Sequence, residues 1–115
     1  MKVYLASIAT SLQEIDTKVY ETFEKSLKYI YDSLKSLVSE EVEGCDFFDR
    51  DYIHEYFTED FFVDKFCRVN CRLSYGEFII EKIKDDKYQF VFSPISSKRI
   101  NYFIICELQI LELLN

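Results

Sequence analysis

The chain has 115 residues, of which 49% are hydrophobic and 17% aromatic, with only two glycines and one proline. This composition excludes a disordered protein, and the shortage of turn-forming residues argues against a sandwich of many strands. We expect a single domain over residues 1–115, long enough to bury a core without disulfides or metal.

The net charge of −7 is concentrated in one segment. Residues 40–64 contain ten acidic residues, and Arg50 is the only lysine or arginine among them. A surface of one sign attracts partners of the opposite sign and repels those of its own sign. We therefore expect a basic protein as partner, with no direct binding to nucleic acid and none to an anionic membrane.

The first residues, MKVYLASIATSLQEID, do not have the pattern of a signal peptide, because Tyr4 and Ser7 interrupt the apolar run and charges follow from Glu14. No run of about 18 apolar residues is present that could cross a bilayer. Four cysteines without a secretory signal are typical of reduced thiols. These features predict a cytoplasmic protein.

A helical spacing of apolar residues begins near Ser11. The residues recur at steps of three and four, and they are Leu12, Ile15, Val19, Phe23, Leu27, Ile30, Leu34 and Leu37. This pattern predicts a long amphipathic helix from about Ser11 to Val42, ending nearer Ser39 if the acidic residues beyond it are unfavourable at a helix C-terminus. Ser11 and Glu14 are suited to a capping box at its start.

The segment CDFFDRDYIHEYFTEDFFVDKF, residues 45–66, contains eight aromatic rings and seven carboxylates. Its spacing predicts one or two short helices with Ile53, Tyr56 and Phe57 on one side. Aromatic rings supply contact area at low entropic cost, and carboxylates form charge-assisted hydrogen bonds with Arg and Lys. The predicted partner-binding residues are Asp49, Asp51, Tyr52, Glu55, Tyr56, Glu59 and Asp60. The alternative is that the rings belong to the core and the acids form a solvated surface.

After Phe66 the apolar period changes to two, which is typical of strands with one buried face. A first strand is predicted over residues 67–75, followed by a hairpin that turns at Asp85 and Asp86, a stop at Pro94, and a fourth strand in INYFIICELQIL. The predicted fold class is α+β, in which a long N-terminal amphipathic helix and short helices pack on a four-stranded antiparallel sheet.

No catalytic, cofactor or metal motif stands out. His54 is the only histidine, and we interpret it as a surface residue among carboxylates. Cys67 and Cys71 share a strand face with Cys106 on a neighbouring strand, but the second pair of ligands that a zinc site needs is missing. The aromatic strand KYQFVFS resembles those that stack on RNA bases, although it lacks the glycines of that motif. We therefore expect no enzyme, no cofactor and no metal.

In surface chemistry the chain resembles small acidic inhibitors of basic enzymes, such as immunity proteins of bacterial toxins and phage-encoded inhibitors of nucleases. The resemblance implies a non-enzymatic protein that neutralises a basic partner, for example a nuclease toxin domain. A phage-encoded inhibitor of a host nuclease is one alternative. The other is a structural or regulatory homo-oligomer, such as a homodimer, assembled through the N-terminal helix.

Overall fold

The computed structural model describes residues 1–41, 53–58, 68–73, 76–94 and 102–113. Within these ranges the chain forms six strands, one α-helix and one short 3-10 helix. In chain order they are β1 (Lys2–Thr10), β2 (Glu14–Tyr20), α1 (Phe23–Glu41), η1 (Ile53–Phe57), β3 (Arg68–Leu73), β4 (Gly76–Lys84), β5 (Lys87–Pro94) and β6 (Ile104–Glu112). Both helices therefore lie in sequence between the first hairpin and the other four strands.

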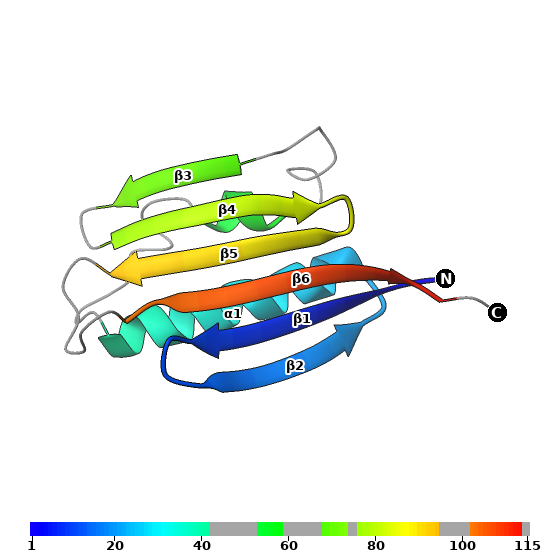
Figure 1. Ribbon diagram of the computed structural model, residues 1–115, viewed down its shortest axis with the longest axis horizontal. Coiled ribbons are helices and arrows are strands. Elements are labelled where there is room, and N and C mark those ends of the chain that lie inside the picture. The colour runs from blue at the N-terminus through cyan, green and yellow to red at the C-terminus, as the bar shows by residue number, and fades with distance from the viewer. Residues whose placement is uncertain (42–52, 59–67, 74–75, 95–101, 114–115) are drawn as a thin grey trace.

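The strands form one antiparallel sheet in the order β2-β1-β6-β5-β4-β3. Most neighbours in the sheet are also neighbours in sequence, but β1 and β6 come from opposite ends of the chain. Their register runs from Lys2 opposite Glu112 to Thr10 opposite Ile104. Figure 1 shows that the start of β1 and the end of β6 consequently lie side by side at one end of the sheet.

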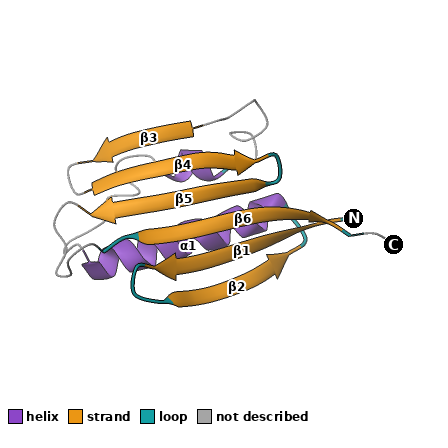
Figure 2. Ribbon diagram, in the orientation of Figure 1, coloured by secondary structure: helices purple, strands orange, loops and turns teal. Residues whose placement is uncertain are grey.

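The molecule has two layers, because both helices lie on the same face of the sheet, behind it in Figure 1 and Figure 2. Its shortest dimension is 21 Å, which fits one sheet and one layer of helix. We call the other side of the sheet the open face. None of the segments that the structure describes covers it.

One side of α1 fills the centre of the core. Its buried apolar residues are spaced by three or four positions, and they are Phe23, Leu27, Ile30, Leu34 and Val38. Thr22 caps the start of the helix, since its Oγ1 accepts a hydrogen bond from the N–H of Lys25 at 3.2 Å. The sheet contributes the opposing buried side chains, Ala6, Ile8, Phe78, Ile80, Tyr88, Phe90, Phe92, Ile104, Cys106 and Leu108.

The predicted architecture, a long N-terminal helix on a four-stranded sheet, is wrong. The chain begins with the hairpin of β1 and β2, and the helix starts only at Phe23. Ser11 lies in the hairpin turn and Glu14 at the start of β2, so they form no capping box. Ile15 and Val19 match a helical spacing, but they belong to a run rich in β-branched residues, which favour extended backbone.

The strands predicted after residue 66 are present as the consecutive antiparallel neighbours β3, β4, β5 and β6. The hairpin turn at Asp85 and Asp86 is confirmed, and β5 ends at Pro94. The sheet does not stop at β6, because β1 pairs with its free edge and β2 pairs with β1. This extension gives six strands instead of the predicted four.

Candidate functional site

A groove lies between the β1–β2 hairpin and one flank of α1. Its first part is a cavity of about 360 Å³, lined by Ile8, Ile15, Tyr29, Asp32, Ser33, Ser36 and Leu37. Its second part is a cavity of about 330 Å³, lined by Thr10, Leu12, Gln13, Ile15, Leu37, Glu40 and Tyr102. Because Ile15 and Leu37 line both parts, we treat them together as the hairpin–helix groove.

The groove combines apolar walls with negative charge. Leu37 is half-buried and Ile15 is 44% exposed, so both offer apolar surface to a ligand. Asp32 and Glu40 are exposed, and neither forms an ion pair with any residue in the described ranges. No lysine or arginine is among the described residues that line the groove. The two carboxylates are therefore not engaged by a described cation and remain available to a ligand.

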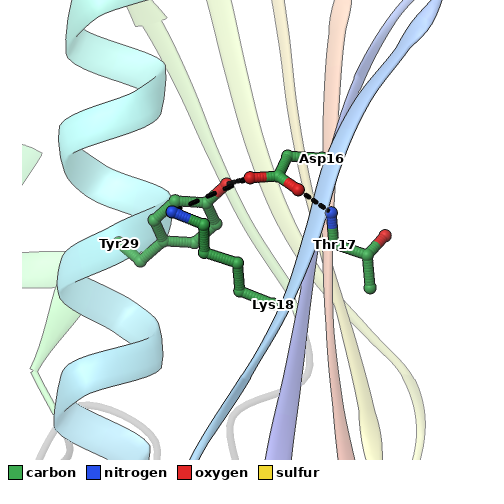
Figure 3. A network of polar contacts seen from close by, with 4 residues as sticks. All are labelled: Asp16, Thr17, Lys18 and Tyr29. Atoms are coloured by element: carbon green, nitrogen blue, oxygen red, sulfur yellow. Dashed lines mark hydrogen bonds and ion pairs between the residues drawn. The ribbon is translucent and has the colours of Figure 1, made fainter.

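A polar contact beside the groove joins β2 to α1. The hydroxyl of Tyr29 donates to Oδ2 of Asp16 at 3.1 Å, and the N–H of Thr17 donates to Oδ1 at 2.8 Å. The Nζ of Lys18 lies 3.8 Å from the Asp16 carboxylate and 4.9 Å from the centre of the Tyr29 ring. Figure 3 shows these side chains meeting between the strand and the helix. The contact holds the edge strand against α1 and so fixes one wall of the groove.

The same contact changes the acidity of Tyr29. Burial is the main cause that raises the pKa of Tyr29 above its ordinary value of 10.0, and the hydrogen bond to Asp16 is the next. Both causes favour the protonated phenol. Tyr29 therefore remains a hydrogen-bond donor to Asp16 throughout the physiological pH range.

The groove is chemically suited to a lysine or arginine side chain. Such a side chain has an aliphatic stem, which gains from contact with apolar surface, and a cationic head, which stays near polar groups or carboxylates. Ile15 and Leu37 provide the apolar surface, and Asp32 and Glu40 provide the carboxylates. The groove therefore offers a bound lysine or arginine both the apolar surface that its stem needs and the carboxylates that its cationic head needs.

Of the predicted acidic segment, residues 45–66, the structure describes residues 53–58, which include η1. This short helix lies on the flank of α1 opposite the groove. Phe57 anchors this short helix in the core, with its ring 5.2 Å from those of Tyr31 and Phe90 and 5.8 Å from that of Phe78. Glu55, on the same turn, is exposed. The middle of the acidic segment is thus fixed to the helix–sheet core while Glu55 faces solvent.

Of the seven predicted partner-binding residues, the structure describes Glu55 and Tyr56. Tyr56 is half-buried, and a hydrogen bond with Cys71 on β3, followed by burial, raises its pKa. Its hydroxyl therefore faces the sheet. The other five lie outside the described residues, and they are Asp49, Asp51, Tyr52, Glu59 and Asp60. The role of all seven as partner contacts stays a prediction.

The residues considered for metal binding or catalysis are dispersed. Cys71 on β3 and Cys106 on β6 are free thiols separated by two strands, and burial raises the pKa of the Cys106 thiol. Cys67 lies outside the described residues, and His54 is exposed on η1. Within the described ranges, no group of three or more His, Cys, Asp or Glu side chains is arranged to hold a metal ion. The aromatic rings of the strand KYQFVFS lie in the core, where they cannot stack on bases.

Sequence reasoning missed the groove because it assigned the hairpin residues to a helix. Ile15 and Leu37 are 22 positions apart in sequence and meet only because β2 and α1 fold together. The alternation of Ile15, Thr17 and Val19 with Asp16 and Lys18 is the signal that could have identified β2.

Comparisons with protein-family models, with curated proteins and with solved structures give no match for this chain. Among the described residues, no helix is both long enough and apolar enough to span a membrane.

Proposed function

We propose that this protein is a non-enzymatic binding protein that recognises a basic protein partner through the hairpin–helix groove. The observation that carries the proposal is the hairpin–helix groove, in which Asp32 and Glu40 lie beside apolar surface and form no ion pair with any described residue. The partner would place a lysine or arginine side chain in the groove.

The charge distribution supports the same partner. Glu40 lines the groove and is also the first of the ten acidic residues in the segment 40–64. The groove and the acidic segment thus adjoin in sequence at the end of α1. A basic partner would be steered by the net negative charge of the chain, and the groove would supply a local contact of defined shape.

Nuclease domains are our proposed class of partner, because their substrate-binding surfaces are rich in lysine and arginine in order to contact phosphates. A protein that covered such a surface would inhibit the nuclease without any chemistry of its own. An immunity protein for a nuclease toxin and a phage-encoded inhibitor of a host nuclease both fit this description, and they differ only in the source of the partner.

The test uses a panel of purified nuclease domains with basic active sites. Complex formation is measured by titration calorimetry at low and moderate salt, and nuclease activity is measured with and without this protein. We expect a complex with at least one domain, loss of its activity, and weaker binding at higher salt. Absence of a complex at low salt across the panel would count against a nuclease as partner.

Charge-neutralising variants test the role of the groove. The double variant Asp32→Asn and Glu40→Gln should weaken binding by about tenfold, because it removes two charged contacts. The matched control is Glu21→Gln and Asp86→Asn, which removes the same charge from exposed positions away from the groove. Equal affinities of the two double variants would show that binding depends only on total charge. The contact with the partner would then lie outside the groove.

A further inference from the structure

The open face of the sheet carries a row of apolar side chains across four strands. Ala9 on β1 lies opposite Ile105 on β6, which lies opposite Val91 on β5, which lies opposite Ile79 on β4. Phe103 precedes β6, belongs to the same face by alternation, and is 37% exposed. We call the four paired residues, Ala9, Ile105, Val91 and Ile79, the apolar row. In Figure 1 this face is turned toward the viewer, with the helices behind it.

A polar row lies beside the apolar row. In the order β1-β6-β5-β4 it consists of Ser7, Glu107, Gln89 and Glu81. Both rows run across the sheet, perpendicular to the strands. The centre of each row falls between β6 and β5, which are also the two central strands of the sheet.

The charges on the open face balance one another. By strand register and alternation it carries the carboxylates of Glu14, Glu77, Glu81 and Glu107, and the basic groups of Arg68, Arg72, Lys84 and Lys87. Some are already paired, since Lys87 Nζ lies 3.2 Å from Glu107 and Arg72 Nε lies 3.9 Å from Glu77. The net charge of −7 therefore resides elsewhere, and two copies of this acidic chain could meet at this face without strong repulsion.

The size of the face matches a stable interface between two copies. Six strands spaced by about 4.8 Å and six to nine residues long make a surface of roughly 700 Å². Specific complexes bury about 800 Å² on each partner. Contact over the whole open face would therefore come close to the standard size.

We infer that the protein forms a homodimer in which the open faces of two copies pack together, related by a two-fold axis that runs parallel to the strands between β5 and β6. With this axis, β6 of one copy lies over β5 of the second copy, and β1 lies over β4 of the second copy. Ile105 then packs on Val91 of the second copy, and the small Ala9 packs opposite the larger Ile79. In the polar row, Glu107 meets the neutral Gln89 and Ser7 meets Glu81. Apolar thus meets apolar, and no two like charges are opposed within either row.

The first test measures the oligomeric state by sedimentation across a wide range of protein concentration. We expect the unmodified protein to be a dimer that dissociates on dilution. Ile105→Lys and Val91→Glu should each weaken the dimer by at least tenfold, because each buries a charge against an apolar side chain. The matched control Leu12→Lys adds a charge at a residue that is 59% exposed in the hairpin turn, and it should leave the dimer intact.

The second test mixes the two variants and is specific to the proposed axis. In a dimer of Ile105→Lys with Val91→Glu, the new lysine faces the new glutamate at one contact, and the other contact keeps its native isoleucine and valine. The mixture should therefore dimerise at concentrations at which each variant alone is a monomer. This result cannot arise from unfolding of either variant, and circular dichroism of the separate variants checks their fold.

A monomeric unmodified protein at all concentrations would overturn the inference. A dimer that survives both substitutions would overturn the choice of face, and a mixture that stays monomeric would overturn the axis. These outcomes are independent of the proposed binding of a basic protein, because the groove lies on the other side of the sheet.

Discussion

The ring of Phe57 stacks on the ring of Phe90, with 5.2 Å between the ring centres and 20° between the ring planes. Phe90 is fully buried on β5, whereas Phe57 belongs to the short helix η1 at the middle of the acidic segment. The pair therefore couples the position of the acidic segment to the packing of the core.

Replacing Phe57 by alanine should lower the free energy of unfolding by about 3 to 4 kcal/mol, because it leaves a cavity between Tyr31, Phe78 and Phe90. Urea denaturation measures this change. Leu12→Ala serves as the control, since Leu12 is 59% exposed and its truncation should cost less than about 0.5 kcal/mol. Similar losses for the two variants would mean that Phe57 is not part of the core.

Gly76→Ala should destabilise the fold by about 1 to 3 kcal/mol through crowding at the start of β4. A Cβ at this position would lie 2.7 Å from the ring of Phe92 and 2.7 Å from the carbonyl oxygen of Ser93 on β5. The backbone oxygen cannot rotate away, so a change of rotamer at Phe92 relieves only part of the contact. Thermal denaturation checks the prediction, and an unchanged melting temperature would show that the strands can separate at this point.

Tyr29→Phe should cost about 1 kcal/mol at neutral pH, since it removes the hydrogen bond to Asp16. The cost should depend on pH because the pKa of Tyr29 is raised in the folded protein. Below about pH 10 the phenol is protonated in both states and the contact contributes fully. As the pH rises above 10, the unfolded tyrosine loses its proton first, and the contribution falls until the pH passes the raised pKa.

Urea denaturation of the native protein and of Tyr29→Phe at several pH values tests this sign. The difference in stability should be constant from pH 7 to about pH 10 and should shrink at higher pH. Changes in the other tyrosines and in Cys106 affect both proteins and cancel in the difference. A difference that grows above pH 10 would contradict the contact with Asp16.

The thiol of Cys106 should resist alkylation in the folded protein, because Cys106 is buried and its pKa is raised by that burial. Cys71 on the edge strand is half-buried and should react before Cys106. Time-resolved labelling with mass spectrometry distinguishes the two, and Cys106 should react only as fast as the whole protein unfolds. Labelling of Cys106 as fast as Cys71 would show that the sheet opens locally.

The sequence by itself determined the parts of the fold in which residues close in sequence pair with one another. Phe78 and Ile80 alternate on one side of the turn at Asp85 and Asp86, and Phe90 and Phe92 alternate on the other side. A period of two on both sides of a short turn allows one hairpin register that buries all the rings on the same face. The central part of α1 was likewise predictable, since its buried residues keep a spacing of three and four.

The acidic character of the protein could also be predicted from the sequence, but the shape of its candidate site could not. The charge of the segment 40–64 follows from composition alone. Whether any carboxylate lies beside apolar surface depends on which elements meet. Glu40 and Asp32 line a groove only because the β1–β2 hairpin lies along the flank of α1.

Only the tertiary structure decided the conformation of the first 20 residues. Ile15 and Val19 fit a helical period of four as well as a strand period of two, so local spacing gave no unique answer. Pairing selects the strand conformation, because β1 pairs with β2 on one side and with β6 on the other. The pairing of Lys2 with Glu112 joins residues 110 positions apart, and its free energy comes from hydrogen bonds and burial that no local pattern records.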